Sequence, residues 1–213
     1  MRSAGSAAVP LAVPRPADDL ADNRARSLRR LRGRARRYAV ANHLARLCVV
    51  TNREVITDRG VMLRRVSGFI RRLRAAHGPL PYMVTLEWHP GGHGLHANVL
   101  LDRWIAKDEL AALWGHGFVD VRLMRSRRRR GVSPARVASS YAVKYATKAA
   151  EEWPRQHAYE VGQGFQPEVV RLSGTDLVRR VIGVMGGEVP SYVWDSASVT
   201  DWRGPPVLFV AWG

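Results

Sequence analysis

The feature that most constrains the fold of this chain is a pair of apolar segments on either side of a glycine-rich turn. Residues 82–88 read "YMVTLEW", residues 96–102 read "HANVLLD", and the connection between them is "HPGGHGL". Segments rich in Val, Leu and aromatic residues around such a turn are typical of a β-hairpin, whose two strands run antiparallel. We therefore expect an antiparallel sheet.

The segments around this hairpin follow the order strand, helix, strand, strand, helix, strand, helix. Strands are predicted at 46–52 and 118–124, and helices at 60–78, at 106–117 and from Ser133-Pro134, an N-cap and first-turn proline, to about Glu151. Further along, 174–187 can form a helix and 205–212 a terminal strand. This order predicts an α+β protein, an antiparallel β-sheet with helices packed on one face.

Charge is the second constraint. The 213-residue chain holds 34 Lys and Arg against 18 Asp and Glu, a net charge of +16, which predicts a polyanionic partner such as nucleic acid. Two arginine runs, 24–37 and 125–130, are expected to contact DNA phosphates, and the residues chosen from them are Arg29, Arg30, Arg32, Arg127, Arg128, Arg129 and Arg130. A merely solvated surface is the alternative; a membrane-surface helix would need a bulky apolar face that the runs lack.

Cysteine content and apolar run length exclude further classes. The single cysteine, Cys48, rules out an internal disulfide and a cysteine-based zinc cluster, and its apolar surroundings favour a buried thiol. No apolar run is long enough to cross a bilayer, and the N-terminus lacks the apolar core of a secretory leader. We expect a cytoplasmic protein with no membrane partner.

The hairpin carries a carboxylate, an imidazole and an amide. His96 and Asn98 are two residues apart and therefore leave the same face of their strand, and the hairpin can bring Glu87 opposite them. This mixed oxygen and nitrogen set suits Mg²⁺ or Mn²⁺ with open water positions. The alternatives are an ordinary half-buried His96 and a zinc cluster of His96 with His89 and His93.

The predicted helix after Ser133 contains "YAVKYATK", which holds two of the three lysines of the chain. Tyr141 and Tyr145 are one helical turn apart, and Lys144 and Lys148 follow each tyrosine at the third position. A phenol needs a nearby positive charge to react as phenolate, and lysine provides one as a compact point charge. The alternative is that the tyrosines pack in the core while the lysines extend to solvent.

Together these motifs resemble the HUH endonucleases, which include rolling-circle replication initiators of plasmids and small phages. The segment "GLHANVLLDRWIAKDELAALWGHGFVDVRLM" followed by "YAVKYATK" is similar to plasmid and phage initiators of high-GC Gram-positive bacteria, and the resemblance covers roughly 45–213. His96 and Asn98 match the metal-binding motif, and Tyr141 and Tyr145 match the nucleophile motif. Asn98 departs from the usual second histidine; circovirus-type initiators tolerate glutamine there and use an upstream glutamate, whose place Glu87 would take.

The resemblance implies a function and a division of the chain. A tyrosine would nick single-stranded DNA at a replication origin, leaving a 5′-phosphotyrosyl link and a free 3′-hydroxyl, with Mg²⁺ or Mn²⁺ as cofactor and both lysines offsetting charge. The sequence has no P-loop motif, so a host helicase and polymerase would be the partners. A transposase, a relaxase and a non-catalytic DNA-binding relative are the alternatives. The expected division is a flexible tail (1–21), an arginine-rich arm or helix (22–45), an HUH-type nuclease domain (46–151) and a C-terminal extension packed on it (152–213).

Overall fold

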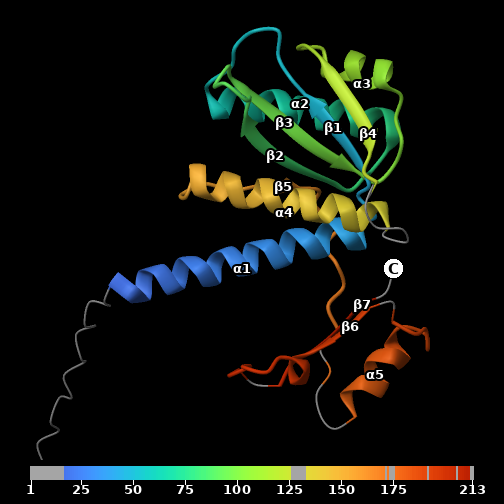
Figure 1. The fold of residues 1–213 in the computed structure, drawn as a ribbon. Coiled ribbons are helices and arrows are strands. Elements are labelled where there is room, and N and C mark those ends of the chain that lie inside the picture. Colours follow the sequence, from blue (N-terminus) through green and yellow to red (C-terminus); the bar gives the residue numbers. More distant parts are fainter. Residues whose placement is uncertain are drawn as a thin grey trace, which may run out of the picture.

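The computed structural model of the protein describes residues 17–125, 133–170, 172, 176–190, 192–204 and 206–211. Its main body contains, in chain order, α1 (Ala17–Ala41), β1 (Arg46–Val50), α2 (Arg59–His77), β2 (Tyr82–Trp88), β3 (Leu95–Leu101), α3 (Lys107–Trp114), β4 (Val119–Leu123), α4 (Pro134–Glu152) and β5 (Glu160–Val161). A C-terminal part contains α5 (Leu177–Val184), β6 (Tyr192–Asp195), a short 3-10 helix (Ser196–Ser198) and β7 (Leu208–Ala211) (Figure 1).

The main body is built on one antiparallel sheet of five strands in the order β4-β1-β3-β2-β5. The prediction of an α+β protein with an antiparallel sheet and helices is confirmed. β2 and β3 form the expected hairpin, and their register places Glu87 directly opposite His96. β3 is the central strand, and all seven of its residues are buried.

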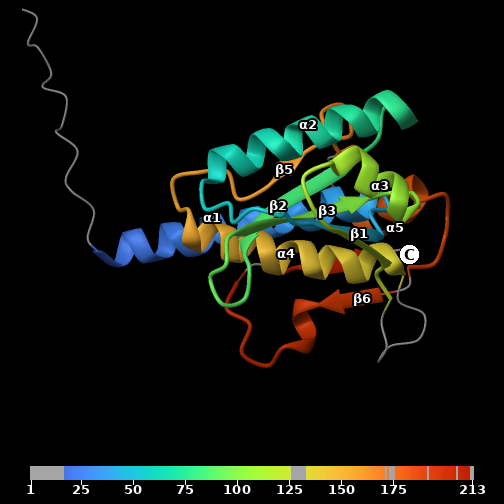
Figure 2. The same cartoon turned by 90° about the horizontal axis from the view of Figure 1, so that it is seen from above.

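Helices cover both faces of this sheet, which corrects the expectation of helices on one face (Figures 1 and 2). On one face α2 and α3 enclose a core that includes Cys48, Phe69 and Trp114. On the other face α1 and α4 pack against a second group of buried side chains, among them Leu47 and Leu100. A central strand covered on both sides is apolar at most positions, so its sequence does not show the alternation that a half-exposed strand has.

Local signals in the sequence set the ends of the two long helices of the main body that follow β1 and β4. Asp58 caps α2 by accepting a hydrogen bond from the Val61 backbone N–H, and Gly78 ends it with φ of 74°, a conformation that favours glycine. Ser133 caps α4 by accepting from the Arg136 backbone N–H, and Pro134 occupies the first turn. These signals fix where α4 starts and therefore which of its residues lie over the sheet.

The N-terminal region forms the helix that was one of the two alternatives expected for 22–45, an arginine-rich arm or helix. Residues 1–16 lie outside the described residues, and 17–21 are already helical, whereas a tail to residue 21 was expected. The helix continues to Ala41, and it buries Ala35, Tyr38 and Ala39 against α4 and the sheet. The second half of α1 is therefore part of the hydrophobic core and does not form an arm outside the compact body.

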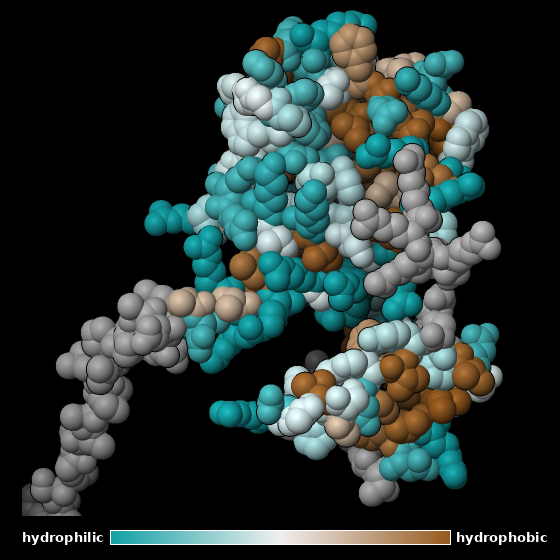
Figure 3. Space-filling model, viewed as in Figure 1, coloured by the Kyte–Doolittle hydropathy of each residue, from teal (hydrophilic) through white to brown (hydrophobic). Residues whose placement is uncertain are grey.

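The C-terminal part separates into two pieces. β5 pairs with β2 and extends the edge of the main sheet. β6 and β7 form a two-stranded sheet of their own, which lies with α5 below α1 in Figure 1. Part of its surface is apolar (Figure 3), and large side chains such as Val193 and Phe209 are exposed. None of the helices among the described residues has the length and apolarity needed to span a membrane.

Candidate functional site

The most polar part of the buried interior lies on the sheet face that α4 covers. β2 contributes Glu87, and β3 contributes His96 and Asn98, which are 8% and 2% exposed. The Nε2 atom of His96 lies 3.3 Å from Glu87 Oε2, and the Asn98 amide nitrogen donates to the same oxygen at 3.4 Å. The sheet alone thus gathers a carboxylate, an imidazole and an amide, as the hairpin pattern indicated.

Two side chains of α4 complete this cluster from above the sheet. The Tyr141 hydroxyl donates to Asn98 Oδ1 at 3.1 Å, and Lys148 Nζ donates to Glu87 Oε1 at 2.8 Å. Residues seven apart on a helix lie on the same side, two turns from each other, which is how one helix reaches both ends of the cluster. Five predicted site residues from three elements are therefore in contact.

The other two residues of the tyrosine motif lie farther out. The ring centroid of Tyr145 is 4.3 Å from that of Tyr141, with the ring planes tilted by 41°. Lys144 is exposed, and its Nζ atom lies 5.1 Å from the centroid of the Tyr145 ring. The two lysines, which are equivalent in the sequence motif, thus differ in the structure: Lys148 contacts the carboxylate, whereas Lys144 lies beside the outer ring.

Burial shifts the pKa values of the central groups. It lowers the pKa of His96, which favours the neutral imidazole. It also raises the pKa of Tyr141, and the neighbouring Tyr145 phenol and Glu87 carboxylate add to that increase. The hydrogen bond with Glu87 raises the pKa of Lys148, which keeps the ammonium charged. Near neutral pH the cluster therefore holds a neutral imidazole, a protonated phenol and an ion pair.

The donor atoms around Glu87 fit a divalent cation. Adjacent ligands of an octahedral ion bound at about 2.1 Å are separated by about 3 Å, close to the 3.3 Å and 3.4 Å found between Glu87 Oε2 and its two neighbours. The Asn98 amide has to turn so that its oxygen, rather than its nitrogen, faces Glu87, and the two orientations have the same shape. One carboxylate, one imidazole and one amide oxygen would then hold Mg²⁺ or Mn²⁺.

The three-histidine alternative is not formed. The ring centroid of His89 lies 5.9 Å from that of His96, and both line a hollow of about 230 Å³ together with His93. Across the described part of the chain, no three His, Cys, Asp or Glu side chains are placed to hold a metal ion together.

The predicted DNA-contacting arginines do not lie in this cluster. Arg29, Arg30 and Arg32 are exposed on α1, and Arg32 donates through Nε to the Thr147 hydroxyl of α4 at 3.1 Å. The second group, 127–130, lies outside the described residues. The first arginine run therefore borders the outer side of α4, across the helix from Glu87.

One charged residue near the site was missed by the sequence reasoning. Arg122 on β4 pairs with Leu47, so its side chain leaves the sheet on the face covered by α4. Its guanidinium acts to lower the pKa of Tyr141, which partly offsets the effect of burial. The alternation of "FVDVRLM" assigns Arg122 to one face, but only the strand order brings that face to the tyrosine.

No protein-family model, no curated protein and no solved structure matches this chain.

Proposed function

We propose that this protein is a metal-dependent single-strand DNA endonuclease and strand transferase of the HUH type that initiates rolling-circle replication. The observation that carries the proposal is the contact of Tyr141 and Lys148 with a buried cluster of Glu87, His96 and Asn98 on adjacent strands. The strand order β4-β1-β3-β2 agrees with a ferredoxin- or RRM-like sheet, which the sequence resemblance implied. The net charge of +16 agrees with a DNA substrate.

In this proposal Glu87, His96 and Asn98 would hold a divalent ion, which would supply Lewis-acid polarisation of the scissile phosphate. A phenol oxygen of Tyr141 or Tyr145 forms a bond to phosphorus while the bond between phosphorus and the 3′-oxygen breaks. The phenol proton leaves to solvent and the 3′-oxygen takes one up, so the products are a 5′-phosphotyrosyl link and a free 3′-hydroxyl. A second tyrosine within 4.3 Å allows a second transfer of the same kind.

Positive side chains of the chain offset the charge that this reaction develops. Lys148 neutralises Glu87 in the resting arrangement, and Lys144 and Arg122 are exposed where a phosphate can approach the tyrosines. Burial raises the pKa of Tyr141 and so opposes phenolate formation. The nucleophile therefore depends on these cations, and their removal should slow cleavage more than it weakens binding.

One observation favours a second candidate, a non-catalytic DNA-binding relative. The side-chain oxygen of Asn98 accepts a hydrogen bond from the Tyr141 hydroxyl. The atom that would bind a metal is therefore already bonded to another side chain of the protein. If this hydrogen bond is never replaced, the cluster has only a structural role. The substitution Asn98→His, which restores the usual ligand of the family, separates the two candidates.

The deciding experiment incubates the full-length protein with a random pool of single-stranded oligonucleotides and Mn²⁺, followed by denaturing electrophoresis. A covalent protein–DNA adduct is expected, and EDTA should prevent it. Tyr141→Phe with Tyr145→Phe should abolish the adduct, and each single substitution should leave partial activity if the tyrosines alternate. An adduct that persists in the double variant would contradict the proposal, and activity that appears only with Asn98→His would favour the second candidate.

A further inference from the structure

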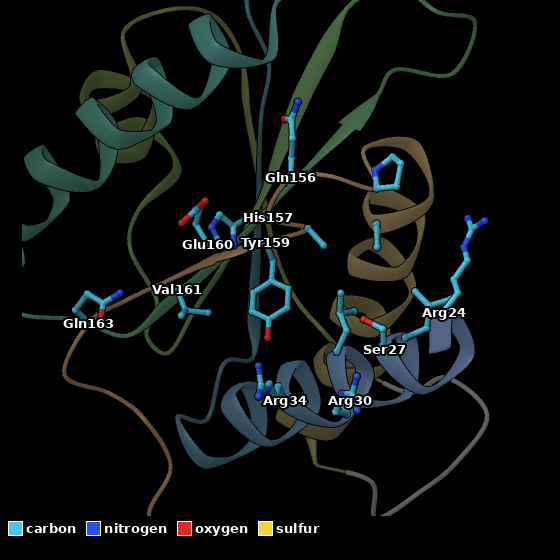
Figure 4. A pocket seen from close by; sticks show the side chains of 15 residues that line it. Arg24, Ser27, Arg30, Arg34, Gln156, His157, Tyr159, Glu160, Val161 and Gln163 are labelled. Atoms are coloured by element: carbon cyan, nitrogen blue, oxygen red, sulfur yellow. The ribbon is translucent and has the colours of Figure 1, made fainter. Parts of the chain in front are cut away.

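A second concave region lies on the other side of α4 from the catalytic cluster. It is a groove of about 740 Å³ between the middle of α1 and the segment 154–163, which runs from the end of α4 past β5 (Figure 4). Its lining includes Arg24, Arg30, Arg34, Gln156, Tyr159 and Gln163. The side chains are mainly polar, and they come from regions more than a hundred residues apart in the chain.

The arginines of the groove form a row along one side of α1. Arg24 and Arg34 are ten residues apart, which is about 15 Å along a helix, and Arg30 lies between them. Among the described side chains, no carboxylate lies within 4 Å of these three guanidinium groups, and Glu160 is the one acidic residue in the lining. The groove therefore has a positive wall that is not neutralised internally.

Tyr159 forms an aromatic surface opposite this wall. Figure 4 shows its hydroxyl directed toward α1 and Arg34. The ring is partly buried, and its contacts include the group of apolar side chains between α1, α4 and the sheet, so that its position is fixed. A row of cations along a backbone path, with an aromatic ring on which a base can stack, is the arrangement that binds single-stranded nucleic acid.

We infer that this groove is a second binding site for single-stranded DNA, in which Arg24, Arg30 and Arg34 contact successive phosphates and a base stacks on Tyr159. The inference rests on the proposed function, because it assigns to the groove a part of the same strand that is cleaved at Tyr141 or Tyr145. The groove and the catalytic cluster share α4: Ala150 lines the groove, and Lys148 contacts Glu87 on the opposite side of the helix. A strand that passes the C-terminal end of α4 can therefore occupy both.

The shape of the groove favours a single strand over a duplex. Stacking on Tyr159 needs an unpaired base that can leave its neighbours, and a duplex presents only paired, stacked bases to a groove of this size. An acidic peptide could also bind the arginine row, but it would gain nothing from the aromatic surface. Competition between the two ligands therefore separates these alternatives.

The test measures binding of labelled oligothymidylate longer than about 16 nucleotides to the full-length Tyr141→Phe, Tyr145→Phe protein in EDTA, so that no cleavage takes place. Arg30→Ala with Arg34→Ala removes two charges from the groove. The matched control, Arg64→Ala with Arg71→Ala, removes two charges from exposed positions of α2 outside the lining. The groove pair should lower the slope of log affinity against log salt by about 1.4, because each phosphate contact to a single strand contributes about 0.7, and the control pair by clearly less.

The aromatic contact is tested in the same background. Tyr159→Leu should weaken binding about tenfold, and Tyr159→Phe should leave it unchanged, because stacking requires the ring and not the hydroxyl. Thermal unfolding checks that Tyr159→Leu remains folded. If this variant is unfolded, the comparison of the two arginine pairs still tests the groove. A poly-glutamate peptide should compete weakly.

Two outcomes would overturn the inference: equal losses in the groove and control pairs, or displacement of the oligonucleotide by poly-glutamate at similar concentrations. Neither outcome bears on catalysis, which is measured as covalent adducts of the unsubstituted protein. If adducts form but the two arginine pairs behave alike, the groove inference fails and the proposed function stands. If the groove binds as expected but no adduct ever forms, the proposed function fails instead.

Discussion

The two faces of the central sheet are both covered by helices, but they differ in chemistry. The face under α2 and α3 is aliphatic and aromatic, and the indole N–H of its Trp114 donates to the Thr51 carbonyl at 2.7 Å. The face under α1 and α4 is apolar around Leu100 and polar around His96 and Asn98. The same strand, β3, supplies both faces through alternate residues.

This difference indicates which face serves a function beyond packing. Buried polar groups are stable only when hydrogen-bonded, and apolar residues of similar volume would often stabilise the fold as well or better. Glu87 is bonded to Lys148, His96 and Asn98, whereas the His96 Nδ1 atom is buried without a hydrogen-bond partner among the described residues. Such a concentration of polar contacts at one end of one face is typical of a functional site.

The largest expected effect comes from comparing two substitutions, one on each face of the sheet. Glu87→Gln should reduce cleavage by at least about 100-fold while sparing DNA affinity, because phosphate contacts dominate binding. Phe69→Ala, on the face under α2, should lower the free energy of unfolding by about 3–5 kcal/mol and leave cleavage per folded molecule unchanged. Cleavage assays and urea unfolding measure the two effects. The comparison fails if Glu87→Gln cleaves normally in EDTA.

An intermediate effect is expected from shortening α1, because its second half belongs to the face under α4. Deleting residues 1–37 removes Ala35 and the bond from Arg32 to Thr147, and it uncovers the alanines of α4. Stability should fall by about 3 kcal/mol or more, as for other large losses of core packing. A deletion that ends at Asp22 removes none of these contacts. Equal melting temperatures for the two deletions would show that α1 is a separable arm after all.

The smallest effect concerns pH. The pKa of His96 is lowered by burial, so below about 6.5, where an unfolded histidine titrates, the unfolded chain binds more protons than the folded one. The free energy of unfolding of the metal-free protein should therefore fall as pH decreases from about 7.5 to 5.5. His96→Gln should flatten this dependence. On the other face burial raises the pKa of the Cys48 thiol to about 12, so that group contributes nothing in this range.

The pH comparison has one group that needs its own control. His116, beside Trp114 at the rim of the other face, also has a lowered pKa, from burial and from Arg65 and Arg72. Its effect on stability has the same sign as that of His96. His116→Gln measured in parallel separates the two contributions. If the dependence of the unfolding free energy on pH changes with His116→Gln and not with His96→Gln, the expected pH sensitivity of the face under α4 is wrong.

Much of the polar cluster around Glu87 could be predicted from the sequence because its geometry is local. The turn "HPGGHGL" and the two-residue period of a strand place Glu87 opposite His96 and put Asn98 on the same face. The cap at Ser133 starts α4, and helical periodicity then puts Tyr141 and Lys148 on one side. Each of these relations depends on backbone geometry over a few residues.

Only the tertiary structure decided how these local units meet. The strand order brings Arg122 near Tyr141, and the path of α4 places Lys148 on Glu87 while leaving Lys144 in solvent. In α1 the apolar residues Leu31, Ala35 and Tyr38 are separated by arginines in the sequence. The sequence pattern therefore did not indicate that this side of the helix is buried. The groove joins α1 to Tyr159 from the far end of the main body. Contacts between distant segments depend on which faces are buried together, and periodicity identifies a face without identifying its partner.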